Sequence, residues 1–438
     1  MQLHRSFVFL LGFVLTVACG GGGHSAPVTP SGPGASAPSV APSAKGSGSS
    51  VPAAASATIA IGPGYSDVGP HQLVRTSANV LYAIAPTCSQ YPACPGGTLP
   101  AYMATNPGTP SGFVQVDAAD APQPQSANDA IGSSAIAIDS NDLIWVAWTQ
   151  RVNNGSAFIT TFNTHSNTWG TPAQLEITNF QFGQGDEGIA LALDASGTPH
   201  VVWDFTDSTG VTHLHYAHGL SGGGFTTPLQ VDDYPLAAMH GVIHPAVAFA
   251  PDGSFVAAWL DGFGPYLPNG TIHVRTRDPA GNWGSSSEIP DVAMTTIDNG
   301  PSILITGDGV RHVAFVNGSD TIRYWYGPDG INWHGDQQPA TQQSHDPSLG
   351  PDGAGGIYIY GHGTPEPNIY GTGVNLYRFH KSAGATSWSP FTLWVSGTYD
   401  CSVSTRWAQF FQSFPATTDA LYWNPNGGMA SALFVGEN

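Results

Sequence analysis

Polar side chains of the kind that bind ligands recur along this 438-residue chain, just before each copy of a repeated phrase. Asp186 and Glu187 precede the copy that begins at Gly188, and His244 precedes the copy that begins at Pro245. Carboxylates and imidazoles suit hydrogen bonds to hydroxyl groups, binding of a cation, or general acid–base catalysis. The elements that position these groups therefore decide which chemistry is available.

The repeated phrase has the pattern of a β-hairpin. Residues 188–203 read GIALALDASGTPHVVW and residues 245–259 read PAVAFAPDGSFVAAW, with apolar residues alternating on either side of a turn rich in Asp and Gly. Alternation interrupted by turn residues is typical of two antiparallel strands. Copies of the phrase begin at His71, Ser134, Gly188, Pro245, Pro301, Pro347 and Ser402.

Each copy is followed by room for two further strands. Residues 212–218 and 271–277 have the pattern of a third strand, and a turn, often with a Trp, then leads into a fourth. Four-stranded units repeated about every 50 residues are the signature of a β-propeller. We therefore predict an all-β fold, a β-propeller of seven blades, with six as the alternative. The strand at 57–62 would complete the last blade and close the ring.

The first 56 residues are predicted to lie outside this domain. Residues 1–19 form a signal peptide with a lipobox-like end at Cys19. Acylation of Cys19 would make the chain a membrane-anchored lipoprotein outside the cytoplasm, and a plain secretory signal is the alternative. Residues 20–56, rich in Gly, Pro, Ser and Ala, form a flexible linker. The propeller domain then spans 57–438, and the lipid is its only expected membrane contact.

Composition limits the partners. Asp and Glu number 30 against 11 Lys and Arg, which gives a formal net charge of −19. Because phosphate binding needs Lys and Arg, nucleic acid is excluded as a partner. Cys88 and Cys94 lie in a Pro- and Gly-rich loop of an exported chain, which favours a disulfide between them. We also expect the domain to be a monomer.

Two turns resemble the Asp box of the bacterial neuraminidase repeat. Residues 327–333 read GPDGINW and residues 278–283 read DPAGNW, each a shortened form of Ser-x-Asp-x-Gly-x-x-Trp. The domain therefore resembles the sialidase-like β-propellers. The resemblance implies an Arg that binds a substrate carboxylate, and Arg75 stands in a comparable first strand. The rest of the family's Phe/Tyr-Arg-Ile-Pro motif is not matched around Arg75.

A propeller gathers the loops that enter its innermost strands at one face, together with the loops between second and third strands. We expect a ligand site at this entry-loop face. The candidates for catalysis are Asp186, Glu187, Asp204, His244, Asp261 and Arg75. The candidates for ligand binding are His71, Asp129, Arg151, His240, Tyr266, Asn299, Asp346, His362, Glu366 and Arg406. No cofactor is assigned, although calcium or another divalent cation would suit such a face.

Other polar residues have structural interpretations. His200 and His312 occupy equivalent places in two copies of the phrase and are predicted to pack between blades. Asp194, like the other Asp residues in these turns, is predicted to form a hairpin turn rather than a calcium site. His213 and His215 share one face of a third strand, which we interpret as solvated and without a carboxylate beside it.

The expected function is recognition of carbohydrate or a glycoconjugate at the entry-loop face. An enzyme is one alternative. A sialidase-like glycoside hydrolase predicts two carboxyl groups across the mouth of the channel, and a polysaccharide lyase predicts a His, a Tyr and an Arg in one pocket. The other alternative is a structural or protein-interaction propeller without catalysis.

Overall fold

The computed structural model describes part of the chain. The described residues are 58–63, 73–78, 80–84, 98–104, 114–117, 121–122, 130–151, 156–177, 188–236, 241–263, 269–291, 293–294, 300–317, 321–336, 344–352, 354–363, 375–390, 392–395, 409–414, 417–424 and 430–435. The chain divides into two compact units, Met1–Val51 and Pro52–Asn438, and all of these residues belong to the second. Their regular elements are strands, so they include no apolar helix of membrane-spanning length.

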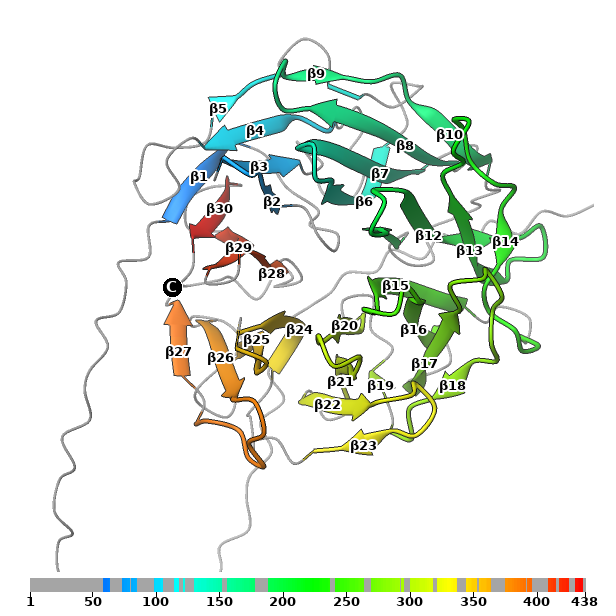
Figure 1. Ribbon diagram of the computed structural model, residues 1–438, viewed down its shortest axis with the longest axis vertical. Helices are drawn as coiled ribbons and strands as arrows, with labels where there is room; N and C mark the ends of the chain where they lie inside the picture. The colour runs from blue at the N-terminus through cyan, green and yellow to red at the C-terminus, as the bar shows by residue number, and fades with distance from the viewer. Residues whose placement is uncertain are drawn as a thin grey trace, which may run out of the picture. The chain divides into compact units, whose positions relative to one another are not determined.

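The strands form antiparallel sheets that follow one another along the chain (Figure 1). The first sheet pairs, in order, β2 (Leu73–Arg75), β3 (Leu81–Ile84), β4 (Ala101–Ala104) and β5 (Val114–Gln115). The second pairs β6 (Ala130–Ile138), β7 (Leu143–Arg151), β8 (Ser156–Asn163) and β10 (Ala173–Ile177), with β9 (Thr168–Trp169) beside β8.

A nine-stranded sheet holds the next two repeats of this order. One contributes β11 (Ile189–Leu193), β12 (Pro199–Thr206), β13 (Thr212–His218) and β14 (Leu229–Gln230). The other contributes β15 (Gly241–Phe249), β16 (Phe255–Phe263), β17 (Asn269–Arg277), β18 (Ser287–Glu288) and β19 (Ala293–Met294). A single parallel pairing, between Thr212 and Gly241, joins the two repeats.

Three four-stranded sheets complete the described fold. The first contains β20 (Ser302–Ile305), β21 (Arg311–Val316), β22 (Ile322–Gly327) and β23 (His334–Gly335). The second contains β24 (Ser344–Pro351), β25 (Ile357–Gly363), β26 (Asn375–Lys381) and β27 (Thr392–Val395). The last pairs β28 (Gln409–Phe414), β29 (Thr417–Asn424) and β30 (Ala430–Val435) with the N-terminal strand β1 (Thr58–Pro63).

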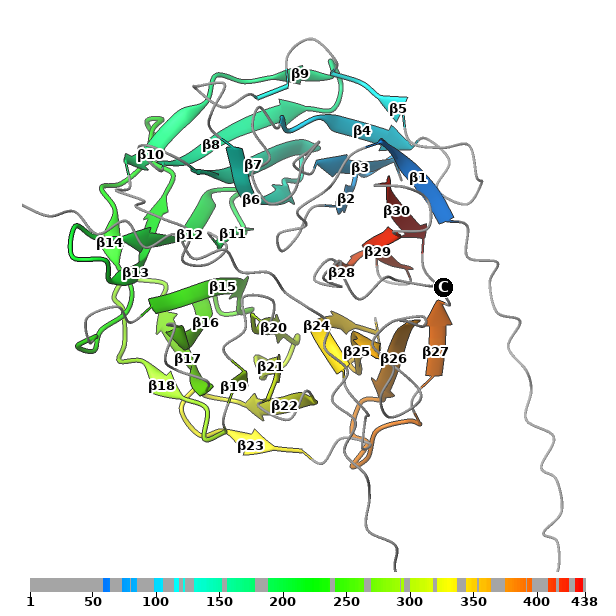
Figure 2. The ribbon, with the colours of Figure 1, turned by 180° about the vertical axis from the view of Figure 1, so that it is seen from behind.

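Six of the predicted hairpins and the pairing of the N-terminal strand are confirmed. The start of the seventh at Ser402 lies outside the described residues, and the first described strand there begins at Gln409. Strands β11 and β12 pair antiparallel with Ile189 opposite Trp203, as the alternating pattern requires. Strand β1 pairs antiparallel with β30, with Ile59 opposite Leu433. The last sheet is thus assembled from the two ends of the domain (Figure 2).

The first strand of each repeat touches the first strand of its neighbours. The contacts run from β2 to β6, β11, β15, β20, β24 and β28, and from β28 back to β2. These innermost strands bring together segments that are far apart in sequence. Gly188, His244 and Gly300, at the start of three of these strands, lie close together.

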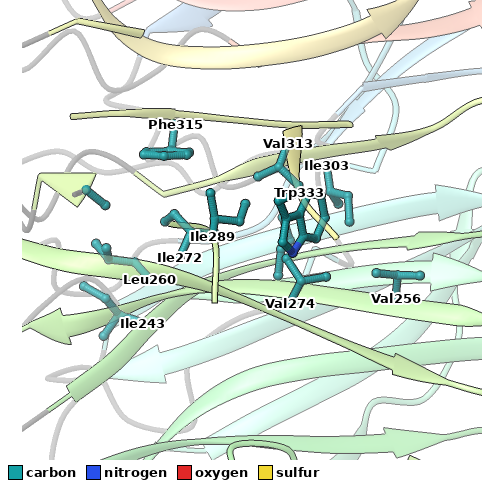
Figure 3. Close-up of a cluster of buried hydrophobic side chains, with 13 residues drawn as sticks. Ile243, Val256, Leu260, Ile272, Val274, Ile289, Ile303, Val313, Phe315 and Trp333 are labelled. Carbon is teal, nitrogen blue, oxygen red and sulfur yellow. The ribbon is translucent and has the colours of Figure 1, made fainter. Parts of the chain in front are cut away.

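The hydrophobic core lies between successive sheets. One cluster joins Leu260 and Val274 of one repeat to Val313 and Phe315 of the next, with Trp333 against them (Figure 3). Similar clusters join the other neighbouring repeats from β2 to β27. A fully buried side chain such as Phe315 contributes about 2–3 kcal/mol. This packing between faces fixes each sheet against the next and so positions the loops at their ends.

Candidate functional site

The entry to β11 is held by a buried carboxylate. Asp204 lies at the end of β12 and is 1% exposed. Its Oδ2 accepts a hydrogen bond of 2.8 Å from the Gly188 amide, and its own amide donates to the Gly188 carbonyl at 3.0 Å. In the preceding repeat Thr149 Oγ1 accepts from the Ser133 amide at 3.0 Å. A second-strand side chain thus fastens the point where the chain enters the innermost strand.

His244 occupies the corresponding entry position in the next repeat. It lies in β15 at a register shift between Ile243 and Ala246, and its φ of 55° is in the left-handed region. A left-handed backbone costs a non-glycine residue about 1–2 kcal/mol. A similar register shift between His345 and Ser348 contains Asp346, so this candidate shares the entry position in β24.

Glycines on both sides leave room for His244. A Cβ placed on Gly188 would lie 2.6 Å from Pro245 Cδ and 3.1 Å from His244 Cα. A Cβ on Gly300, which enters β20, would lie 2.6 Å from His244 Cβ. The entry points of three successive repeats therefore meet at His244. Asp204 Oδ2 and His244 Cα both lie close to Gly188, at 3.0 and 3.1 Å from a Cβ placed there.

Asp261 lies in β16, opposite Val242 of β15, and contacts the third strand of its repeat. Its Oδ2 is 3.4 Å from His273 Nε2. The ring of Tyr234 stacks on His273 at 4.5 Å, and Trp259 Nε1 donates to the Tyr234 hydroxyl at 2.8 Å. Burial, with a smaller contribution from Asp261, raises the pKa of Tyr234 above its usual range. This Tyr is therefore a poor proton donor at neutral pH.

An Arg lies on the same strand as His273. Arg275 lies two residues after His273 on β17, and its guanidinium donates to the carbonyls of Val231 and Gly284. It also pairs with Asp233 at 3.6 Å. These bonds tie β17 to the segment that leaves the preceding repeat. Arg275 thus serves to join two repeats.

The same kind of contact recurs in the neighbouring repeats. Glu176 Oε2 accepts from Trp203 Nε1 at 3.1 Å and lies 2.7 Å from His215 Nδ1. Asp291 Oδ2 accepts from Arg323 Nε at 2.8 Å and from Trp325 Nε1 at 3.1 Å. Because a contact repeated from sheet to sheet belongs to the scaffold, we interpret the Tyr234–His273 group as structural.

Arg75 lies away from Asp204 and His244. It is the last residue of β2 before a hairpin turn in which the Thr76 amide donates to the Val80 carbonyl at 2.9 Å. It is 5% exposed. The turn is at the opposite end of an innermost strand from its entry loop. Arg75 therefore does not join the entry-point residues.

The remaining candidates are not described at the level of side chains. Three of them have backbone positions in strands, namely Arg151 in β7, Asp346 in β24 and His362 in β25. His362 pairs with His345 across β24 and β25. Outside the described residues lie Asp186, Glu187, His71, Asp129, His240, Tyr266, Asn299, Glu366, Arg406, Cys19, Cys88 and Cys94.

The interpretation of His213 and His215 as a face without carboxylates is wrong. His215 meets Glu176 as described above, and His213 Nδ1 lies 2.7 Å from Asp232 Oδ2. Asp232 follows the fourth strand, β14, which folds back beside β13. The sequence carried this signal in the pair Asp232–Asp233, but only the pairing of β14 with β13 places it against His213.

The structural interpretations of His200 and His312 are confirmed. His200 Nδ1 lies 2.7 Å from the Tyr216 hydroxyl, and its ring packs against Phe249 of the next repeat at 4.8 Å. His312 Nδ1 lies 2.6 Å from the Tyr324 hydroxyl. Burial lowers the pKa of both imidazoles to about 4. Neither is poised for proton transfer at neutral pH.

The Asp residues of the hairpin turns bind their own backbone. Asp194 Oδ1 accepts from the amides of Ser196 and Thr198, each at 2.8 Å. The same pattern holds for Asp352, and the hairpin-turn prediction is confirmed. Within the described ranges, no three or more His, Cys, Asp or Glu side chains are grouped as a metal site.

Comparison with known proteins gives a fold. No family model and no curated protein matches the chain. It is similar to the BP39L lectin from Burkholderia pseudomallei, with 13% identity, a TM-score of 0.56, and coverage of 86% of this chain and 98% of the lectin. It is also similar to a PL25 ulvan lyase, with 11% identity, a TM-score of 0.54, and coverage of 87% and 95%. The chain has a β-propeller fold.

A third similar structure is the Hadza microbial sialidase Hz136. Its identity is 10% and its TM-score is 0.49, with coverage of 78% of this chain and 73% of the sialidase. The PL25 ulvan lyase has also been solved bound to -[GlcA(1-4)Rha3S]-. The structures similar to this chain with a TM-score above 0.5 thus include a lectin and a polysaccharide lyase.

Proposed function

We propose that this chain is an exported carbohydrate-binding propeller whose ligand lies at the entry-loop face. Two of its structural neighbours, a lectin and a lyase solved with an oligosaccharide, support carbohydrate as the ligand class. The acidic net charge of −19 favours a neutral or hydroxyl-rich ligand over a polyanion. Acylation at Cys19 and the linker at 20–56 would hold the domain at a membrane surface.

The observation that carries the proposal is the placement of His244. One imidazole takes an unfavourable left-handed backbone at a point where two neighbouring repeats supply glycines. The buried Asp204 carboxylate is fastened to the same place through Gly188. Strain of this kind persists where the surroundings enforce it, and it clusters at ligand sites. An imidazole is a suitable partner for a sugar hydroxyl group, whereas Asp204, which is 1% exposed, holds the backbone of the entry point.

Binding is preferred over turnover because the described residues His273, Tyr234 and Arg275 are engaged between repeats. His273 and Tyr234 stack on each other, and Arg275 bonds to backbone carbonyls of adjoining segments. None of these three is available to a substrate without breaking the contact between two sheets. The lyase alternative therefore needs a different set of residues.

We also propose that the ring has seven blades. The contacts of innermost strands from β2 to β28 and back to β2 support this number. The nine-stranded sheet contributes two of the blades, since only one pairing joins its halves. Strand β1 would then close the ring by completing the last blade.

A glycan array with the purified chain tests the proposed function, with His244→Gly as the variant. Glycine accepts a left-handed backbone, so His244→Gly should fold at least as stably as the wild type. We expect the wild type to bind a defined group of glycans and His244→Gly to lose at least tenfold in affinity. The matched control is His165→Gln, because His165 lies exposed in the turn between β8 and β9.

The array also separates the alternatives. Product analysis of each bound glycan distinguishes a lectin from a hydrolase or a lyase. Absence of any bound glycan, or equal binding by the wild type and His244→Gly, would overturn the proposal.

A further inference from the structure

His213 departs from the repeat in a way that the scaffold does not explain. It lies opposite Phe205 across β12 and β13. At the same register position, three other repeats have a small residue with a hydroxyl group, Ser156, Thr271 and Thr321, and a fourth has Asn375. His215, two residues later on β13, contacts Glu176 of the preceding repeat, and an equivalent contact is made by Arg323. His213 therefore calls for a separate explanation.

A buried carboxylate orients the His213 ring. The side chain of Asp232 is fully buried. Its Oδ2 lies 2.7 Å from His213 Nδ1 and accepts from Gln230 Nε2 at 2.7 Å, while its Oδ1 accepts from the Leu214 amide at 2.8 Å. Because Asp232 is held on several sides, it fixes the hydrogen of His213 on Nδ1. The lone pair of the neutral ring is then on Nε2.

A second carboxylate faces that lone pair. Asp207 Oδ2 lies 3.8 Å from His213 Nε2. Asp207 is itself fixed, since its Oδ1 accepts from the amides of Thr209 and Val211 at 2.7 and 3.0 Å. The side chains of Asp207 and His213 are 32% and 18% exposed, so both are in part accessible to solvent.

We propose that His213 Nε2 and Asp207 Oδ2 bind a divalent transition-metal ion such as Zn²⁺. Zn²⁺ takes imidazole nitrogen and carboxylate oxygen at about 2.0–2.2 Å, so both atoms can reach one ion across a gap of 3.8 Å after little movement. Asp232 supplies the outer carboxylate that metal-binding imidazoles usually have. Water completes the coordination, which leaves positions open for an oxygen ligand.

The site lies at the end of the molecule where the proposed ligand binds. Thr212, the neighbour of His213, pairs with Gly241, which begins the strand that contains His244. The metal site does not depend on carbohydrate binding. His213 belongs to β13, Asp207 to the loop before β13, and Asp232 to the segment after β14. Absence of the metal site would leave the proposed function unaffected.

Isothermal titration of the purified, metal-free chain with ZnCl₂ tests the site. We expect one saturable event in the wild type, weakened at least tenfold in His213→Gln and in Asp207→Asn. Asn keeps the turn, since Asn317 Oδ1 accepts from the Thr321 amide at 3.1 Å in the equivalent loop. Asp278→Asn is the matched control, because Asp278 holds a similar turn between β17 and β18. Circular dichroism of each variant verifies the fold.

The positioning role of Asp232 has its own readout. Loss of an outer carboxylate weakens metal binding about 10- to 100-fold, so Asp232→Asn should lower the Zn²⁺ affinity while one ion still binds at saturation. Zn²⁺ should also raise the Tm of the wild type and the Asp278→Asn control, but not that of His213→Gln. Absence of saturable binding in the wild type, or wild-type affinity in Asp207→Asn, would overturn the proposal.

Discussion

The entry position held by His244 distinguishes the candidate site from the repeated scaffold. Gly188, His244 and Gly300 each stand at the entry to an innermost strand, and two of the three are glycine. The third carries an imidazole and adopts a φ of 55°. The two glycines are needed because a Cβ at either one would lie within 2.6 Å of its neighbour. The conformation of His244 is thus imposed by three repeats together.

Gly300→Ala should destabilise the protein. The new Cβ would lie 2.6 Å from His244 Cβ, and overpacking of this kind costs about 1–3 kcal/mol. Gly307→Ala is the control, since a Cβ there meets nothing within 4 Å, and its effect should stay within about 0.5 kcal/mol. Urea denaturation measures both. The double variant Gly300→Ala/His244→Gly should recover most of the loss, and an equal loss in both backgrounds would contradict the contact.

At the scale of elements, one turn device recurs at the hairpins. Asp194 accepts two amide hydrogen bonds within its own turn. Gly197, in the same turn, adopts the left-handed conformation with a φ of 81°. Asp329 also accepts two amide hydrogen bonds between β22 and β23, where bonds from the amides of Asn332 and Ile331 lower its pKa to about 2. Asp194 and Asp329, which resemble cation ligands in sequence, therefore bind the backbone of their own turns.

Asp194→Ala tests the turn device. Loss of the acceptor for the Ser196 and Thr198 amides should lower the free energy of unfolding by about 1–2 kcal/mol. Asp194→Asn keeps an acceptor oxygen and should cost less than half as much. Both values come from denaturant titration with an unchanged m-value. Equal losses in the two variants would show that charge, rather than the bonded turn, matters.

At the scale of the whole molecule, the domain depends on a strand from its N-terminal end. Strand β1 pairs with β30 along Thr58, Ile59 and Ala60. Without it β30 would present an open edge, which favours association between molecules. Strands β1 and β30 both belong to the unit Pro52–Asn438, so a chain without residues 1–51 keeps both strands.

Two truncations measure the contribution of β1. Removal of residues 1–51 should leave the Tm unchanged. Removal of residues 1–63 should lower the free energy of unfolding by a few kcal/mol, about 1 kcal/mol for each lost backbone hydrogen bond, and should produce soluble aggregates detectable by light scattering. Equal stability of the two truncated chains would contradict closure by β1.

Stability should also fall as the medium becomes mildly acidic. The folded state lowers the pKa of His200 and His312 from 6.5 to about 4, so the unfolded chain takes up protons first. The stabilisation is complete above pH 6.5 and is lost as the pH falls to about 4, by about 3 kcal/mol for each His.

Unfolding free energies from pH 7 to pH 4 test this dependence. His312→Gln should remove about half of it, and a flat profile would contradict the burial of these rings. The hydrogen bond to Asp232 is the main cause of a raised pKa for His213. This residue therefore has the opposite effect on how stability changes with pH. Its stabilisation is present below pH 6.5 and is lost as the pH rises through its folded pKa.

The local pattern of the chain was enough to predict the hairpins, the turns and the all-β fold. Alternating residues on either side of Asp194 can form little else, and His200 could be assigned to packing because His312 stands at the same place in another copy. These features depend on residues that are close in sequence or repeated along it.

Tertiary structure decided which polar groups meet. His213 lies 19 residues from Asp232, and His215 lies 39 residues from Glu176; only the pairing of outer strands and the packing between repeats brings each carboxylate to its imidazole. His244 was a candidate from sequence, but its left-handed backbone and the glycines that permit it follow from the packing of three innermost strands. Local patterns dictate which strands form, whereas contacts between repeats arise from the stacking of whole sheets.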